Sequence, residues 1–167
     1  MVVALATLIL TRATQGWTVA SPDGQTAITV GLIIPGGQSH LYYEVACGGR
    51  PVVMSRSPLG IRRKDQDFVV GLEFVAAGDV KAIDETYTML SGKRKTCRNL
   101  ANEQTLVFQN AGGAKVELIV RAYNDGVAFR YRFPEESKDR YTVTAESTGF
   151  RLPAGGKVWA HPYDKPT

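Results

Sequence analysis

The chain has 167 residues, 44% of them hydrophobic and 22% charged, with a formal net charge of +4. These values are ordinary for a globular protein, so they indicate neither disorder nor several membrane spans, and the length fits one domain with a hydrophobic core. The basic runs at 62–64 and 93–95 lie far apart without an RNA-binding or helix-turn-helix motif. Each is interpreted as a solvated loop, and nucleic acid is not an expected partner.

The chain starts with an uncharged apolar run at residues 2–10, followed by polar residues at 11–16. The run is too short to cross a bilayer as a helix, so we expect no stable membrane span. It does not alternate between apolar and polar positions as a half-buried strand would, and it ends in small and polar residues. We predict that residues 1–16 are an export signal; the alternative is an apolar first strand.

From Trp17 onward the pattern predicts short β-strands separated by turns of Gly, Pro, Asn and Asp. The expected strands are 17–20, 25–34, 41–46, 52–54, 68–77, 104–109, 114–133 with a turn inside it, and 141–146. Residues 68–77 are apolar on both faces, which suits a strand buried between layers. Residues 57–61 are expected to form an irregular corner, because Pro58 cannot donate a hydrogen bond within a central sheet. No sustained helical period occurs, so the sequence predicts an all-β fold, an antiparallel β-sandwich.

The strongest local signal is a β-hairpin between residues 114 and 133, with the turn residues Asn124, Asp125 and Gly126. Asn and Asp tolerate a positive φ and Gly adopts it freely, as hairpin turns often require. A loop at 125–126 would set Ala122 opposite Phe129, whereas a loop at 124–125 would set Ala122 opposite Val127. Both registers keep one face apolar, because they differ by a shift of two residues and side chains on a strand alternate with a period of two.

The other face of this hairpin carries Glu117, Arg121, Tyr123, Arg130 and Arg132. The first register would place Arg121 against Arg130, an unfavourable pair, and the second would place Glu117 against Arg132, a favourable one. We expect the three arginines to be solvated. The alternative is that they hold a partner domain or an anionic group.

The hairpin sequence at 121–133 resembles the strongest motif in the N-terminal domain of glycoside hydrolase family 97, whose members are bacterial, calcium-dependent α-glucosidases and α-galactosidases. Further segments resemble the family in the same order along the chain: Val19–Gly24, Ser57–Gly60, Tyr87–Lys93, Arg98–Glu103, Glu146–Phe150 and Trp159. Family members often carry tryptophan at the positions of Tyr87 and Ser91, so the resemblance leaves the sugar open.

The resemblance implies a sandwich of the galactose-mutarotase-like supersandwich type, comprising residues 17–167 and incomplete at its C-terminus. It implies that this domain is non-catalytic and supports the active site of a following (β/α)8 barrel, which would carry the two carboxylates that glycoside hydrolysis needs. Calcium would belong to the full-length enzyme, with ligands outside this chain. The expected partners are an oligosaccharide substrate and the barrel, and the expected location is the periplasm or the outside of a bacterial cell.

A polar cluster precedes the strand at 104–109, with the members Arg98, Asn99, Asn102 and Glu103. Polar side chains at these spacings, across a turn that leads into a strand, can bond one another and fix a loop. We interpret the cluster as structural; contact with a sugar is the alternative. The tryptophans Trp17 and Trp159 are expected in the core, although either could stack on a sugar.

Two cysteines and two histidines offer no metal-site spacing: Cys47, Cys97, His40 and His161. The cysteines could form one disulfide or remain two buried thiols. Two other functions stay open. One is a free-standing carbohydrate-binding or structural sandwich, and the other is a mutarotase-like enzyme, which would need a histidine near a glutamate.

Overall fold

The computed structural model describes residues 15–159. The predicted export signal lies outside this part of the chain, apart from Gln15 and Gly16, which begin the first strand. Within residues 15–159 no helix is long and apolar enough to cross a membrane.

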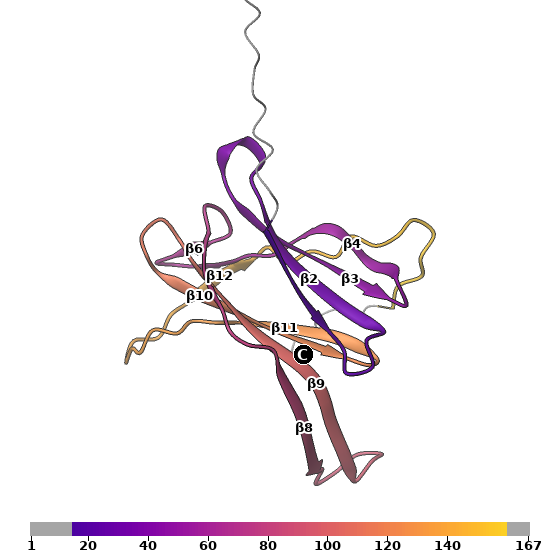
Figure 1. Ribbon diagram of the computed structural model, residues 1–167. Helices are drawn as coiled ribbons and strands as arrows, with labels where there is room; N and C mark the ends of the chain where they lie inside the picture. The colour runs from indigo at the N-terminus through magenta and orange to yellow at the C-terminus, as the bar shows by residue number, and fades with distance from the viewer. Residues whose placement is uncertain (1–14, 160–167) are drawn as a thin grey trace, which may run out of the picture.

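Two antiparallel sheets cross one another face to face (Figure 1). The first sheet has the order β1-β2-β3-β4, with the strands β1 (Gln15–Ala20), β2 (Thr26–Ile33), β3 (His40–Cys47) and β4 (Arg50–Pro58). The second has the order β11-β10-β9-β7, and β8 pairs with β9; its strands are β7 (Glu73–Ala77), β8 (Lys81–Thr88), β9 (Thr96–Gln109), β10 (Lys115–Tyr123) and β11 (Gly126–Arg132).

A small third sheet closes one end of the sandwich, with the order β12-β5-β6 and the strands β5 (Ile61–Arg63), β6 (Asp67–Phe68) and β12 (Val143–Glu146). The helical element that the structure describes is one 3-10 turn, η1 (Pro35–Gly37), in the loop between β2 and β3. The predicted all-β antiparallel sandwich is therefore confirmed.

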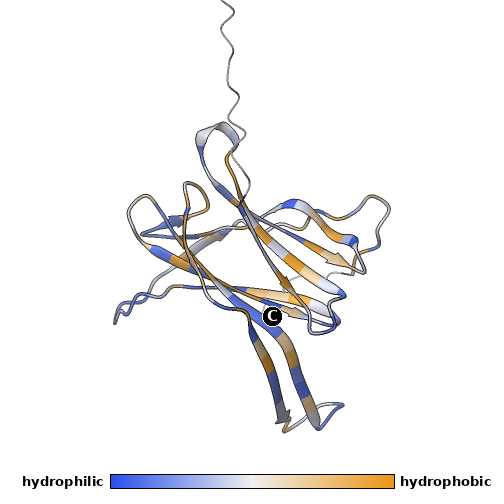
Figure 2. Ribbon diagram, in the orientation of Figure 1, coloured by the Kyte–Doolittle hydropathy of each residue, from blue (hydrophilic) through white to orange (hydrophobic). Residues whose placement is uncertain are grey.

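The core lies between the two large sheets, because apolar and polar residues alternate along their strands (Figure 2). The first sheet contributes six buried hydrophobic side chains to the core: Val19, Ile28, Val30, Leu41, Tyr43 and Val45. The second sheet contributes Leu106, Phe108, Val116, Leu118, Val120 and Ala122. The side chains of Phe129, Tyr131 and Phe133 pack against this cluster from the returning strand of the hairpin, as the alternation predicts.

The predicted strand at 68–77 is wrong, because the segment divides between two sheets. Phe68 ends β6, and Gly71 then takes a φ of 72°, which turns the chain toward β7 at an edge of the second sheet. Strand β7 is largely exposed. The apolar run therefore reflects two separate contacts with the core, at Phe68 and Leu72.

The irregular corner predicted at 57–61 is confirmed only for Leu59 and Gly60, which connect two sheets. Ser57 and Pro58 end β4, and Ile61 begins β5. Strand β4 forms the edge of its sheet, so Pro58 can pair with Tyr42 without interrupting a central ladder.

Strand β8 and the first eight residues of β9 were not predicted as strands. Strand β10 pairs with β9 only from Ala101 onward, so residues 96–100 of β9 have β8 as their strand partner. We call this two-stranded ribbon, residues 84–100, the arm. It extends beyond the two crossed sheets (Figure 1). Since the arm packs on no core face, it shows no simple apolar alternation from which it could be predicted.

Candidate functional site

The hairpin of β10 and β11 adopts the second predicted register. Ala122 lies opposite Val127, and Glu117 lies opposite Arg132, with which it forms an ion pair. The hairpin turn does not use the positive φ that Asn, Asp and Gly tolerate: in the described chain Arg56 is the one non-glycine residue with a positive φ, and Gly126 has none either. The turn residues are therefore not selected for an unusual backbone conformation.

Asn124 instead joins the hairpin to the turn between β1 and β2. Its side-chain oxygen accepts a hydrogen bond from the backbone N–H of Asp23 at 3.2 Å. Its backbone carbonyl accepts one from the hydroxyl of Thr26 at 3.4 Å. Nearby, the Asn102 side chain donates to the carbonyl of Ala20 at 2.8 Å. Three polar contacts thus hold the two sheets together at this end of the sandwich.

The turn at 21–24 is itself built by side-chain hydrogen bonds. The Ser21 hydroxyl donates to Asp23 Oδ1 at 2.6 Å, and the backbone N–H of Gln25 donates to the same oxygen at 3.0 Å. These bonds, the one from Ser21 first, hold the pKa of the Asp23 carboxyl below its usual value. The Asp23 side chain therefore stabilises the turn, and the turn directs the backbone N–H of Asp23 toward Asn124.

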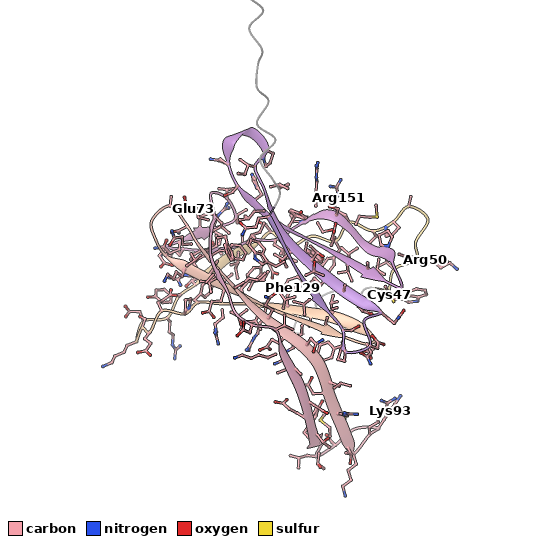
Figure 3. All side chains as sticks on the ribbon, viewed as in Figure 1. Cys47, Arg50, Glu73, Lys93, Phe129 and Arg151 are labelled. Atoms are coloured by element: carbon pink, nitrogen blue, oxygen red, sulfur yellow. The ribbon has the colours of Figure 1, made fainter. Side chains whose placement is uncertain are left out.

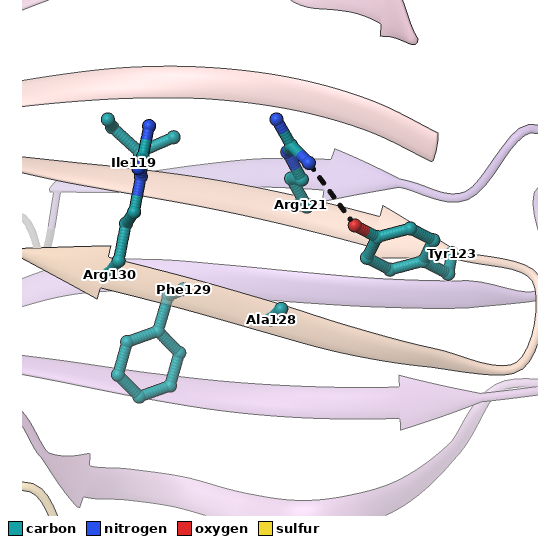
Figure 4. A pocket seen from close by; sticks show the side chains of 6 residues that line it. All are labelled: Ile119, Arg121, Tyr123, Ala128, Phe129 and Arg130. Carbon is teal, nitrogen blue, oxygen red and sulfur yellow. Dashed lines mark hydrogen bonds between the residues drawn. The ribbon is translucent and has the colours of Figure 1, made fainter. Parts of the chain in front are cut away.

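A shallow hollow of about 210 Å³ lies on the outer face of the hairpin, between Ile119, Arg121, Tyr123 and Arg130 (Figure 4). Arg121 donates to the Tyr123 hydroxyl at 3.4 Å and to Glu103 at 2.6 Å, and these two bonds, the one to Tyr123 first, raise the pKa of its guanidinium. Arg130 has no carboxylate within ion-pair distance in residues 15–159. The expectation of three solvated arginines therefore holds best for Arg130, since Arg121 and Arg132 are paired.

The expected turn at Arg98, Asn99, Asn102 and Glu103 is wrong, because all four residues lie in strand β9. They do not bond one another. Arg98 binds Asp84 of β8 through two bonds of 2.7 Å, and Asn99 donates to Glu85 at 2.9 Å. These contacts agree with the structural interpretation of the cluster, and contact with a sugar stays the untested alternative.

Arg63 lies in strand β5 rather than in the solvated loop that was expected for residues 62–64. The Arg63 side chain is 2% exposed, forms ion pairs with Asp65 and Glu135, and stacks on the rings of Phe133 and Tyr141. The bond to Asp65, followed by that to Glu135, raises the pKa of Arg63. One available signal is the alternation around it, since Ile61 and Arg63 point to the same side of β5 and are both buried.

The segment 57–60 and the hairpin meet at Tyr131. The Tyr131 hydroxyl accepts a hydrogen bond from the backbone N–H of Gly60 at 2.9 Å and lies 3.0 Å from the hydroxyl of Thr148. Gly60 passes so close to Val69 that a Cβ on it would lie 3.0 Å from the Val69 Cα. The glycine is therefore required by a close approach of two backbone segments.

The remaining candidate residues are placed separately. Trp17 stacks on Phe74 with ring centroids 4.3 Å apart and belongs to the core, whereas Trp159 is 86% exposed, so the expectation of a core residue is wrong for it. Cys47 and Cys97 are both free thiols, so the expected disulfide is wrong. Neither is buried, so the alternative of two buried thiols is wrong as well. His40 begins β3, and His161 lies outside the described residues.

Several carboxylates of the described chain serve as partners of arginines rather than as a facing pair. Asp65, Asp84 and Glu103 each bind an arginine, and the pKa values of the first two are lowered mainly by those bonds. A general acid in glycoside hydrolysis needs a raised pKa instead. Residues 15–159 contain no group of three or more His, Cys, Asp or Glu side chains placed to hold a metal ion.

Fold and site together define an all-β sandwich domain whose polar residues mainly tie its strands and turns to one another. The chain belongs to the family described as Glycosyl-hydrolase 97 N-terminal, whose model matches residues 19–167.

Two similar proteins are retaining α-galactosidases by name. The chain is 33% identical over 147 residues to a probable retaining alpha-galactosidase of Streptomyces bingchenggensis (strain BCW-1), covering 88% of this chain and 22% of that protein. It is 32% identical over 153 residues to the retaining alpha-galactosidase of Bacteroides thetaiotaomicron, and the match covers 90% of this chain and 21% of that protein.

Solved structures show the same relationship. A beta-arabinopyranosidase superposes with a TM-score of 0.72 at 30% identity, covering 82% of this chain and 21% of that one. A Glycoside Hydrolase Family 97 enzyme from Pseudoalteromonas sp. strain K8, in complex with panose, gives a TM-score of 0.67 at 26% identity, covering 83% and 20%. The chain thus spans about a fifth of the length of these relatives.

Proposed function

We propose that this chain is the N-terminal sandwich of an exported bacterial glycoside hydrolase that acts on α-galactosides or α-glucosides. In this proposal a (β/α)8 barrel follows in the same polypeptide and carries the catalytic carboxylates, while the sandwich supports the active site. The observation that carries the proposal is the family match over residues 19–167, together with relatives of which the chain spans about a fifth.

Of the two sugars, the α-galactoside is the better supported. Both of the curated relatives described above are named as retaining α-galactosidases. A retaining mechanism requires a nucleophile and an acid about 5–5.5 Å apart. The carboxylates at the sites described here are instead held by arginines, which is consistent with placing that pair in the barrel.

Calcium remains part of the proposal only at the level of the full-length enzyme. Calcium takes six to eight oxygen ligands, and the described residues offer no carboxylate cluster that fits it. We therefore assign no residue of this chain to the ion and no step of the reaction to it. Export to the periplasm or outside the cell is proposed from the apolar run at residues 2–10.

The test compares the full-length polypeptide with the 167-residue chain on aryl α-galactosides and aryl α-glucosides. We expect hydrolysis by the longer protein, faster with the galactoside, and none by the isolated chain. Turnover by the isolated chain would contradict the proposal that the catalytic carboxylates lie in the barrel. A gene that encodes no further domain would instead favour a free-standing binding or structural module. A chelator followed by added Ca²⁺ tests the ion, and cell fractionation tests the location.

A further inference from the structure

Most of the arm is exposed, and on β9 only Cys97, Asn99 and Leu100 are partly buried. Of its strands, β8 is almost entirely exposed, and its cross-strand bonds join exposed pairs, Arg98 with Asp84 and Asn99 with Glu85. An isolated two-stranded hairpin is marginally stable in water. Such a ribbon normally needs a further surface against which it can pack.

The outer end of the arm is apolar and basic. Its loop at 89–95 carries Met89, which is 45% exposed, and Leu90, which is fully exposed, and Tyr87 is 50% exposed beside them. Three consecutive cations follow, Lys93, Arg94 and Lys95, all exposed and without an ion-pair partner in residues 15–159. Figure 3 shows Lys93 at the outer end of the arm. Exposed apolar side chains gathered at one place mark an interaction site, and here the charge calls for an acidic partner.

One face of the arm is continuous with the outer hollow. Ile83 lies opposite Ala101, which in turn lies opposite Tyr123, and directly opposed residues share a face of the sheet. By the same alternation Tyr87 lies on this face. The surface therefore runs from the apolar tip to the hollow that contains the unpaired Arg130.

We propose that this surface, which we call the docking face (Tyr87, Met89, Leu90 and the outer hollow), binds the polypeptide that follows the sandwich in the full-length protein. The relatives are about five times as long as the matched part, so a large further chain is available as the occupant. The inference rests on the proposed function and adds to it the place of contact. It requires an acidic patch with an apolar centre on the following domain.

Hydrogen exchange of the backbone amides in β8 and β9 tests the proposal. We expect the amides of residues 84–88 and 96–100 to exchange at least tenfold more slowly in the full-length polypeptide than in the 167-residue chain. Equal rates would overturn the proposal, as would a reading frame that ends with this chain. Slower exchange of the isolated chain at higher protein concentration would indicate a second copy. Slower exchange on anionic phospholipid vesicles would indicate a membrane, and either result also overturns it.

A double variant, Met89→Ser with Leu90→Ser, removes the apolar tip. In the full-length protein it should return the arm to the fast exchange of the isolated chain. The control Ile34→Ser changes an apolar residue that is 42% exposed in the loop between β2 and β3, and it should leave the arm protected. Unchanged melting of the 167-residue chain with the double variant checks that the fold is intact. Persistent protection in the double variant contradicts the proposal.

Exchange does not depend on turnover, so the two proposals fail separately. A protected arm in a polypeptide without glycosidase activity overturns the proposed activity alone. An active enzyme with an unprotected arm overturns the docking face alone.

Discussion

The side-chain oxygen of Asn124 accepts a hydrogen bond from the backbone N–H of Asp23, which is 101 residues earlier in the chain. The bond joins the turn of the hairpin to the turn between β1 and β2, and so connects one sheet to the other. Both turns belong to segments that resemble the family. In the folded chain the two turns therefore form one connected unit.

Replacing Asn124 with alanine should lower the free energy of unfolding by about 0.5–1.5 kcal/mol, since the Asp23 N–H loses its side-chain partner while water replaces part of the bond. The midpoint of urea unfolding measures the change. The matched control is Asp125→Ala, the neighbouring turn residue, for which the structure shows no side-chain bond. An equal loss in both variants would mean that the turn conformation matters rather than the bond.

Arg63→Ala should destabilise the sandwich by about 1.5–3 kcal/mol, because it removes the buried guanidinium together with its bonds to Asp65 and Glu135, which are themselves partly exposed. Arg63→Lys should recover little, since an ammonium group cannot bind Asp65 through two nitrogens and stack on Tyr141. Thermal unfolding gives the comparison.

The control for Arg63 is its neighbour Arg62, whose ion pair with Asp67 is about half exposed on both sides. Arg62→Ala should change the free energy of unfolding by about 0–1 kcal/mol. If the two alanine variants unfolded alike, burial of Arg63 would not be what makes it important.

Tyr43→Phe should stabilise the protein slightly or leave it unchanged. The Tyr43 hydroxyl is buried and has no hydrogen-bond partner in the described chain, so its removal relieves the cost of burying an unpaired polar group. The urea midpoint measures this at neutral pH. A clear loss of stability would show that the hydroxyl has a partner after all.

Burial, with a smaller contribution from Tyr131, raises the pKa of Tyr43 to about 12, above its ordinary value of 10. The unfolded chain therefore loses this proton first, and stability that is complete below pH 10 falls as the pH rises toward 12. In the Tyr43→Phe variant, the part of the loss of stability at alkaline pH that comes from this hydroxyl should disappear. Identical alkaline profiles for the two proteins would exclude Tyr43 as its source.

Two glycines should respond in opposite ways to replacement by alanine. Gly60→Ala places a Cβ 3.0 Å from the backbone of Val69 and should cost about 1–3 kcal/mol. Gly126→Ala meets no atom within 4 Å and requires no positive φ, so it should be neutral or stabilise by about 0.4–1 kcal/mol. A large loss at Gly126 would mean that the turn does require a positive φ at this residue.

The sequence by itself determined the strands that have one apolar and one polar face. Leu118, Val120 and Ala122 alternate with polar residues, so the hairpin and its buried face follow from a period of two, and the charge pairing of Glu117 with Arg132 favoured the register that the structure adopts. The family resemblance likewise depended on residues that are adjacent in the chain.

Only the tertiary structure decided the features that depend on contacts between distant segments. Arg63 is buried because Glu135 and Tyr141 come to it from another part of the chain; alternation with Ile61 could indicate its side of β5 but not these partners. The arm lacks a buried face, so its strands carry no periodic signal, and residues 68–77 appeared as one strand although Gly71 directs them into two sheets. The period of apolar residues along a strand indicates which of its faces is buried. A side-chain contact with a segment that is remote in sequence produces no such local pattern.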